Sequence, residues 1–317
     1  MLGFAARRLV VAAFLVWVVA SLVFLVIHLI PGEPAELLLS QGGVAPDPAA
    51  VAALRERLGL DLPLWVQYRD YIANLLHADF GQSLVDEHSV GAEIALRLPR
   101  TLELIVVAGL LATLIGLPLG VLAALSVGRT LDRILSAAAG LALSVPVFVV
   151  GTLAVLVLAQ QLHWMPAGGY VALAKDPGRH FTLLLMPAGT IALGLAAAVL
   201  RVTRSAVLEV LERDHVRAAQ ARGLAPALLV RRHVVRNALT PVVTVLALHL
   251  GSLLGGTVLV EFVFNYPGLS GYLVRAVEAR DYPEVTGIVL VISALFVLLN
   301  FAVDLCYAVI DPRVRHG

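Results

Sequence analysis

The sequence predicts an all-α membrane protein with six transmembrane helices, on the basis of its composition, its apolar runs and the distribution of its arginines. Hydrophobic residues make up 60% of the 317 residues and charged residues only 14%, whereas soluble domains contain about 45–50% apolar and about 25% charged residues. A soluble protein of this length could not cover its surface with so few polar side chains. The composition therefore excludes a soluble enzyme, a disordered chain and a nucleic-acid-binding protein.

Six apolar runs are long enough to cross a bilayer, for which a helix needs about 20 residues. We expect these spans at about 9–30, 101–125, 135–160, 182–204, 242–264 and 286–310, within one transmembrane domain covering 1–317. The first run follows Arg7 and Arg8 and is longer than the roughly 7–15 apolar residues of a secretory signal. We therefore interpret it as a helix that the protein retains.

The basic residues predict the orientation, because cytoplasmic segments of membrane proteins are enriched in Lys and Arg. With both termini inside, the cytoplasmic segments hold 14 of the 23 basic residues and five of the 22 acidic residues. The outer segments then hold the other nine basic residues and 14 acidic residues. We therefore expect both the N-terminus and the C-terminus in the cytoplasm.

Two segments between the spans are longer than simple connectors. The outer segment, 31–100, has helical patterns at about 51–58 and 65–76, after a start rich in proline and glycine: Pro31, Gly32, Pro34, Gly42, Gly43, Pro46 and Pro48. The inner segment, 205–241, is the most basic part of the chain. Segments of this size are candidates for contacts with other proteins.

The sequence lacks the motifs of an ATPase or a metalloenzyme. A P-loop needs G-x-x-x-x-G-K-[ST], but the one lysine, Lys175, lies between Ala174 and Asp176. No H-E-x-x-H occurs, and the single cysteine, Cys306, cannot form a disulfide within the chain. We therefore predict no catalytic residues, no bound cofactor and no metal site, so that any ATP hydrolysis must come from another subunit.

One alternative is an intramembrane serine protease, since Gly268-Leu269-Ser270-Gly271 resembles a motif of such enzymes. A nucleophilic serine needs a histidine within hydrogen-bond reach. The nearest candidates are His249, in the middle of the preceding span, and His316, in the opposite tail. An ordinary turn before the last helix is the competing interpretation.

A second alternative is an ion-coupled carrier, which usually has several buried carboxylates or broken half-helices. Asp304 lies deep in the last span, one turn from Asn300, and could face the interior of the bundle. Glu103 and Glu261 lie near the ends of spans, where we expect their side chains to reach the membrane interface.

The inner segment predicts two short consecutive helices. Asp214 is a suitable N-cap for a helix over 215–222, and Gly223 can adopt the left-handed conformation that ends a helix. Pro226 suits the first turn of the next helix, which Pro241 is expected to interrupt where the fifth span begins.

The first of these short helices has two competing interpretations. Small side chains at Ala218 and Ala219 on its surface would allow another backbone to approach closely, while Arg217 and Arg222 could bind carboxylates with their fork-shaped donors. Alternatively, the segment is an ordinary cytoplasmic loop that lies on anionic lipid headgroups. Physical reasoning alone favours neither.

The residues of this segment also carry a resemblance. The string R-A-A-Q-A-R-G at 217–223 resembles the E-A-A-x-x-x-G signature of binding-protein-dependent ABC importer permeases, and D-H-V-R-A-A-Q-A-R-G-L at 214–224 resembles its form in the dipeptide/oligopeptide/nickel branch. Arg217 replaces the usual Glu and Arg236 stands where many relatives have Pro, so a contact through that Glu is not available here.

The resemblance extends over nearly the whole chain. Similar motifs occur at P-G-E-P (31–34), L-G-L-D (58–61), D-F-G-Q-S (79–83), Y-P-G-L (266–269) and R-D-Y-P (280–283). Their occurrence in the family's order is more specific than any one of them alone.

The resemblance implies a type I importer permease fold in a bacterial inner membrane. It implies that Asp214, Arg217, Ala218, Ala219, Arg222 and Gly223 belong to the loop that couples the permease to its ATPases. The implied partners are a second homologous permease, two cytosolic ABC ATPases, an extracytoplasmic binding protein and membrane lipid. Relatives carry dipeptides, oligopeptides, glutathione, nickel or sugars, of which we expect peptides.

Three features of the spans could serve the motion of such a transporter. Pro146 should kink the third span by removing a helix hydrogen bond. Gly251 with Gly255, and Gly116 with Gly120, form small-xxx-small faces for close helix packing. The alternative for each is an ordinary packing site.

Overall fold

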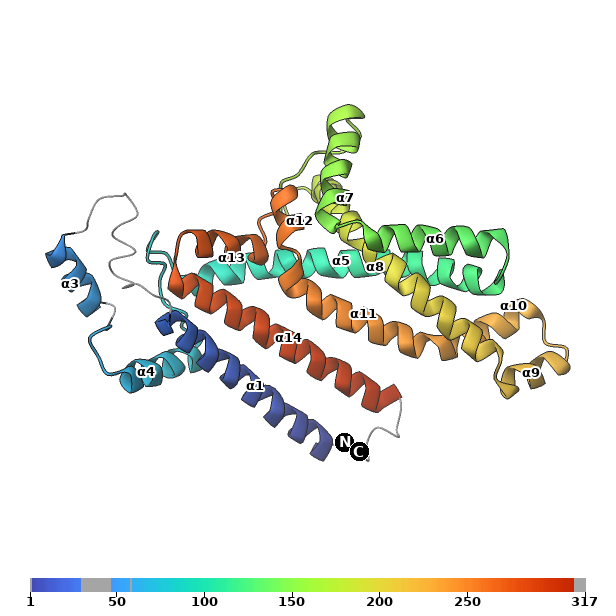
Figure 1. Ribbon diagram of the computed structural model, residues 1–317, viewed down its shortest axis with the longest axis horizontal. Helices are drawn as coiled ribbons and strands as arrows, with labels where there is room; N and C mark the ends of the chain where they lie inside the picture. The colour runs from blue at the N-terminus through green and yellow to red at the C-terminus, as the bar shows by residue number, and fades with distance from the viewer. Residues whose placement is uncertain (1, 30–46, 58, 311–317) are drawn as a thin grey trace. The chain divides into compact units, whose positions relative to one another are not determined.

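The computed structural model of the protein describes residues 2–29, 47–57 and 59–310 (Figure 1). The proline- and glycine-rich stretch up to Pro46, the tail from Asp311 with His316, and the side chain of Asp304 lie outside the described residues. The described part is helical, with one isolated bridge between Gln82 and Ser89, which confirms the all-α prediction. Its helices are α1 (Leu2–Leu29), α3 (Pro48–Arg57), α4 (Leu64–Leu76), α5 (Val90–Leu125), α6 (Thr130–Ser144), α7 (Val147–Ala154), η2 (Val155–Gln161), α8 (Pro177–Leu211), α9 (Asp214–Ala221), α10 (Pro226–Leu229), η3 (Val230–Val235), α11 (Arg236–Gly256), α12 (Val258–Val263), α13 (Leu269–Glu278) and α14 (Tyr282–Ile310).

Five stretches of the described helices are long and apolar enough to cross a membrane. They are Ala6–Val26, Val90–Leu125, Pro177–Leu211, Ala227–Gly256 and Tyr282–Phe301. A sixth candidate arises if α6 and the run from α7 through η2 form one broken span. The bounds differ from the expected ones, since α5 begins at Val90 and the helical run through α11 ends at Gly256.

The break between α6 and α7 is larger than the expected kink. The two halves are bent by 97°, and Pro146 caps α7 at its N-terminus instead of lying inside a helix. Val145 is extended, with ψ 125°, as the residue before a proline prefers to be. The N–H of Val145 still donates to the carbonyl of Leu141, but Pro146 has no N–H with which to continue α6, so the chain turns at these two residues.

Pro241 has the opposite outcome, since it lies within α11 and does not interrupt it. A proline removes only one backbone hydrogen bond, and helices of membrane proteins tolerate this loss where their neighbours adjust. The π-helical turn η3 leads directly into α11. The expected break at this residue was therefore wrong.

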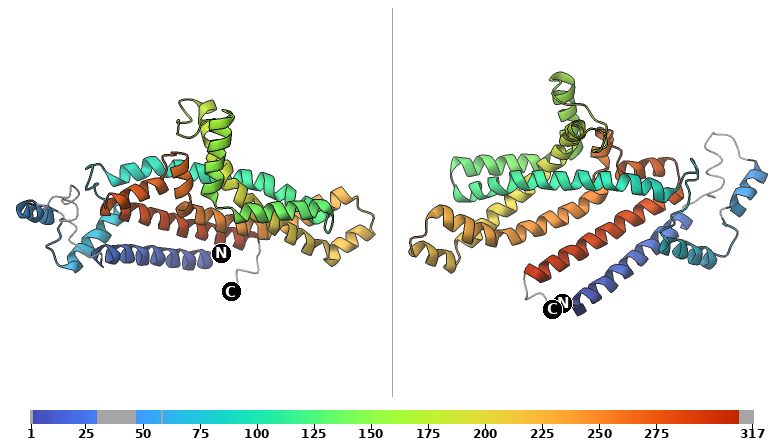
Figure 2. Two further views of the ribbon diagram at one scale, coloured as in Figure 1. Left: turned by 45° about the horizontal axis from the view of Figure 1, so that its top comes forward. Right: turned by 180° about the vertical axis from the view of Figure 1, so that it is seen from behind.

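The chain divides into two compact units, residues 1–99 with 272–317, and residues 100–271. In the first unit, α1 and α14 lie side by side (Figure 2). Helix α4 packs on α1 through aromatic rings, with the ring of Phe24 5.3 Å from that of Tyr68 and 5.4 Å from that of Tyr71. The hydroxyl groups of Ser21 and Tyr68 are 2.7 Å apart, which also joins the two helices.

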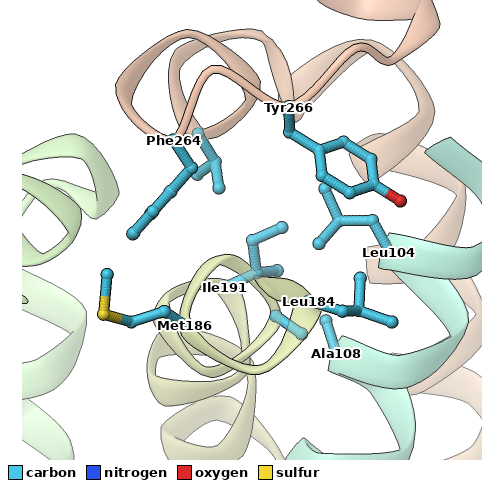
Figure 3. Packing of buried hydrophobic residues seen from close by; sticks show 9 residues of the cluster. Leu104, Ala108, Leu184, Met186, Ile191, Phe264 and Tyr266 are labelled. Atoms are coloured by element: carbon cyan, nitrogen blue, oxygen red, sulfur yellow. The ribbon is translucent and has the colours of Figure 1, made fainter. Parts of the chain in front are cut away.

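In the second unit, α8 is the central helix, with α6, α7 and α11 packed around it (Figure 1). One core cluster combines side chains from α5, α8 and the segment around α12 (Figure 3): Leu104, Ala108, Leu184, Met186, Ala188, Ile191, Val260, Phe264 and Tyr266. Burial raises the pKa of the Tyr266 hydroxyl, which donates a hydrogen bond to the carbonyl of Arg100. This cluster joins the N-terminal half of α8 to α5 and α12.

The glycines of α5 allow the closest helix contact in this unit. A Cβ built at Gly116 would lie 2.5 Å from the carbonyl oxygen of Ala196, and one at Gly120 would lie 2.6 Å from the Cβ of Thr203. The corresponding face of α11 is different, because a Cβ at Gly255 would meet no described atom within 4 Å, although Gly251 is buried. Close packing therefore occurs at the α5 pair and is not found at Gly255.

Candidate functional site

The candidate site is the segment that follows α8, comprising α9, α10 and η3. Helix α9 turns two side chains inward, since Val216 is fully buried and Ala219 is 9% exposed. They belong to a cluster that joins α9 to the end of α8 and to the start of α11: Ala124, Ala206, Val207, Val210, Val216, Ala219, Leu229, Val234 and Ala238. Helix α9 is thus anchored to two long helices by its apolar side.

Two expectations for α9 need correction. Ala219 does not lie on the surface, because the 3.6-residue period of the helix places it on the same side as Val216. Asp214 is the first residue of the helix and not its N-cap, which is Arg213 without a side-chain capping bond. In the first turn, the carboxylate of Asp214 can still stabilise the N-terminus through the helix dipole.

The end of α9 agrees with the role predicted for Gly223. Its φ is +77°, its N–H donates to the carbonyl of Gln220, and the N–H of Leu224 donates to that of Ala219. These two bonds define a Schellman motif, and Leu224 also packs against the buried cluster. The turn therefore directs the chain from α9 into α10, where Pro226 is the first residue, as predicted.

The exposed side of α9 is polar, with a small alanine side chain between charged residues. Arg217, Ala218 and Arg222 are exposed, as is Asp214. Within the described part of the chain, neither arginine forms an ion pair, so both guanidinium groups are available to a partner. A basic surface interrupted by an alanine suits a groove lined with carboxylates.

Neither η3 nor the cavity beside it was predicted from the sequence. A mostly apolar cavity of about 400 Å³ is lined by Leu125 at the end of α5, Ala227 of α10, and Val230, Arg231 and Val235 of η3. Short π-helical segments occur frequently at functional sites. The segment therefore combines a firmly packed helix, α9, with an irregular neighbour.

A partly buried ion pair joins the first turn of α6 to α8. The carboxylate of Asp132 accepts from Arg204 Nε at 2.6 Å and from Arg204 Nη2 at 2.9 Å, and also from the N–H of Gly128 at 3.0 Å. A fork-shaped pair of this kind is directional as well as strong. Arg204 belongs to α8, the helix that precedes α9, and this pair was not predicted from the sequence.

Glu261 does not reach the membrane interface as expected, because it is only 1% exposed. Its Oε1 accepts from the hydroxyl groups of Thr101 and Thr257, and its Oε2 accepts from the N–H of Gly271. A Cβ at Gly268 would collide with this carboxyl group. Glu261 is therefore a structural centre that joins α5, α12 and α13.

Glu103 also differs from the expectation, since its Oε1 lies 2.7 Å from Nε2 of the buried His180. The other ring nitrogen of His180 faces the carbonyl of Val171 at 2.7 Å and must therefore carry a hydrogen. The pair of Glu103 and His180 joins α5 to α8.

Ser270 has the contacts of a structural residue. It is fully buried, and its hydroxyl donates to the carbonyl of Leu254. The same hydroxyl lies 3.0 Å from the hydroxyl of Thr257. None of its partners in the described part is a histidine, so the arrangement that a serine protease requires is not present there.

Replacing Ser270 with alanine is therefore expected to leave transport close to the wild-type rate. The loss of one buried hydrogen bond should lower the free energy of unfolding by about 1 kcal/mol. Uptake by proteoliposomes and a thermal melt of the purified variant measure the two effects. Loss of transport in a variant that melts normally would contradict the structural role.

The described residues offer little support for an ion-coupled carrier. The side chain of Asn300 donates to the carbonyl of Phe296 in its own helix. Among the residues that the structure describes, no group of three or more His, Cys, Asp or Glu side chains could hold a metal ion.

The chain matches a known family over almost its full length. Residues 116–316 match the family described as "Binding-protein-dependent transport system inner membrane component", and residues 1–105 match its N-terminal counterpart. The chain is 39% identical over 316 residues to the glutathione transport system permease protein GsiC of Salmonella choleraesuis (strain SC-B67), with 100% of both chains covered. It is 40% identical over 339 residues to the di/tripeptide transport system permease protein DppB of Pseudomonas aeruginosa (strain UCBPP-PA14), with 100% of this chain and 99% of that one covered.

A solved structure agrees at the level of the fold. The "Crystal structure of an amino acid ABC transporter with histidines" aligns with a TM-score of 0.53 at 16% identity, over 68% of this chain and 92% of that one.

The family match and the permeases to which the chain is similar define a membrane permease of the ABC importer class, and the helical fold with its apolar spans agrees with this class. The chain belongs to the family of binding-protein-dependent transport system inner membrane components, in the peptide and nickel branch that the sequence motifs indicated. It is a multi-pass membrane protein and a transport component that is not itself an enzyme, and its family implies ATPase and binding-protein partners.

Proposed function

We propose that this permease forms half of the pathway for a short peptide, with α9 as the helix through which its ATPase acts. The observation that carries this proposal is the exposed face of α9 with Arg217, Ala218 and Arg222, on a helix whose other face is anchored by Val216 and Ala219. Such a helix can transmit a displacement because it moves together with α8 and α11.

The proposal includes the assembly and its orientation. A second homologous permease completes the pathway, and two ATPases bind in the cytoplasm, where both termini and α9 lie. The excess of arginine in 205–241 supports this orientation. A binding protein delivers the solute to the opposite side, where 31–100 contributes to its docking surface.

The mechanism that follows is alternating access. Closure of the ATPase dimer on ATP displaces α9, and because α9 is packed on α8, rigid-body rotation of the permease halves opens the pathway outward. Hydrolysis restores the inward-facing state. In this mechanism, the bend at Pro146 is the point where the chain flexes, and the close packing at Gly116 and Gly120 makes α5 and α8 move together.

Short peptides are the proposed cargo, and glutathione, itself a small peptide, is the second candidate. The support is the likeness to permeases named for di/tripeptide and glutathione transport. Competition for uptake among a labelled dipeptide, glutathione and chelated nickel, in proteoliposomes containing all subunits, tests this choice. Uptake of nickel or a sugar that no peptide inhibits would overturn it.

The assembly is tested by purifying the tagged chain in mild detergent and identifying everything that remains bound. Two P-loop ATPases and a second six-span protein are the expected partners. Recovery of the chain alone, in a detergent that preserves a known importer complex, would contradict the proposal.

Charge reversal at both Arg217 and Arg222 is expected to reduce ATPase binding about tenfold or more, because each arginine can form a charge-assisted hydrogen bond. Binding of the purified ATPase to the permease in nanodiscs measures the effect. Arg179→Glu is the control, since Arg179 is also exposed but precedes the long apolar run of α8 on the proposed outer side. Equal ATPase binding by the double variant and the control would contradict the assignment of α9.

A further inference from the structure

Residues 82–89 of the first unit form a tight turn that is fixed to the residue before α14. The N–H of Ser83 donates to the carbonyl of His88 at 2.9 Å, and the Ser83 hydroxyl donates to Asp281 Oδ2 at 2.6 Å. The same oxygen accepts from the N–H of Leu84 at 2.9 Å. Because Asp281 is only 1% exposed, this connection is shielded from competing water and holds the turn in place.

The fixed turn places His88 beside two buried groups of the same unit. The hydroxyl of Tyr272 donates to Glu284 Oε1 at 2.5 Å, and Nε2 of His88 lies 3.0 Å from both that hydroxyl and that carboxylate oxygen. Burial raises the pKa of Tyr272, which keeps its hydroxyl protonated as a donor. Glu284 is 6% exposed, yet its second oxygen, Oε2, has no hydrogen-bond partner among the described residues.

A cavity of about 310 Å³ lies against these groups. Glu93 and Arg97 line one wall, where Arg97 Nη2 is 2.7 Å from Glu93 Oε2 and the guanidinium stacks 4.1 Å from the centre of the Tyr272 ring. Asp86 and Arg275 are exposed lining residues at the rim. The volume is at the lower end of the range of about 300–1,000 Å³ for small-molecule sites.

The lining has more acidic than basic groups. Its carboxylates are Asp86, Glu93, Asp281 and Glu284, against the guanidinium groups of Arg97 and Arg275 and the imidazole of His88. Among the described residues, Asp281 accepts hydrogen bonds from the Ser83 hydroxyl and from backbone N–H groups, all of them neutral. The guanidinium of Arg97 is paired with Glu93. Four carboxyl groups therefore face two guanidinium groups in this lining, and a partly enclosed site with an excess of acidic groups attracts a cation.

We propose that this cavity is a binding site for the primary ammonium group of a small organic solute, held by the free oxygen of Glu284 and by Glu93. An ammonium group is a compact charge with three donors, which fits a small cavity lined by several carboxyl groups. A metal ion fits less well, because no cluster of three or more metal-ligating side chains is present in the described residues. Arg275 at the rim is available for a carboxylate of the same solute. The inference does not depend on the cargo proposed above.

The test is calorimetric titration of the assembled importer in nanodiscs with propylammonium, and with propionate at the same ionic strength. Saturable binding of propylammonium and none of propionate is expected. Glu284→Gln should weaken it about tenfold, as for loss of a charged hydrogen-bond partner. Asp86→Asn, at an exposed rim position, should weaken it severalfold. Glu278→Gln is the matched control, since Glu278 is exposed on α13 and outside the cavity lining.

Three results would overturn the proposal. The first is an absence of saturable propylammonium binding by the wild-type protein. The second is equal affinity in the control and in both cavity variants. The third is docking of the binding protein that requires Glu284 while propylammonium does not bind, which would assign the cavity to a lysine side chain of another protein.

Discussion

Replacing Gly223 with valine is expected to separate ATP hydrolysis from transport. The φ of +77° is unfavourable for a β-branched residue, and the left-handed conformation costs about 1–2 kcal/mol for residues other than glycine. A Cβ at this position would meet no atom within 4 Å, so the effect comes from the backbone alone. The Schellman bonds that end α9 should weaken, and α9 should lose its fixed direction relative to α10. ATPase activity and uptake, measured in the same proteoliposomes, should show hydrolysis that continues while uptake falls.

Gly128 provides a matched control for this variant. It also has a φ of +77° with no atom within 4 Å of a built Cβ, but it lies in the turn between α5 and α6. Gly128→Val should therefore lose a similar amount of stability without separating the two activities. Gly223→Asn should have an intermediate effect, because asparagine tolerates the left-handed conformation. Wild-type coupling in Gly223→Val at equal expression would count against α9 as the coupling helix.

Features that depend on neighbouring residues could be predicted from the sequence. The apolar runs gave the helices because a bilayer imposes their length and requires internal hydrogen bonding. Gly223 marks the end of α9 because glycine readily adopts the positive φ found there, and Pro226 marks the start of α10 because proline fixes a φ that suits the first turn of a helix. Local signals were less reliable where two rules compete, as at Pro241, where the membrane-spanning helix continues through the proline.

The polar interactions inside the second unit could not be predicted, because their partners are far apart in the sequence. Glu261 meets Thr101, and Arg204 meets Asp132, across different helices. Periodicity shows that such a side chain lies in or near a span but not which donor faces it. The expectation that Glu103 and Glu261 reach the interface followed from their place near the ends of spans, whereas both contact buried partners.

The inner face of α9 shows a limit of motif reasoning. The family signature marks Ala218 and Ala219 equally, but the structure exposes the first and buries the second. Whether a small residue serves a partner or the fold depends on the rotation of a two-turn helix about its axis. The cluster formed by Val216 with α8 and α11 sets that rotation, and the segment alone does not reveal it.

Replacing Gly120 with alanine is expected to destabilise the protein, although alanine is the better helix former. In an open helical position, Gly→Ala should add about 0.5–1 kcal/mol to the stability. At Gly120 the new methyl group would lie 2.6 Å from the Cβ of Thr203 and 2.7 Å from the carbonyl oxygen of Leu200. The second of these atoms is backbone, so α5 and α8 must move apart. Overpacking of this kind costs about 1–3 kcal/mol, which exceeds the gain in helix propensity.

Gly140 of α6 is the matched control, since a Cβ there would meet no atom within 4 Å. Thermal melts in one lipid should therefore show shifts of opposite sign, downward for Gly120→Ala and upward for Gly140→Ala. Uptake should fall with the first variant, because the contact of α5 with α8 lies on the helix that carries α9. Equal upward shifts in both variants would mean that the two helices separate without cost, and that the face formed by Gly116 and Gly120 does not determine their distance.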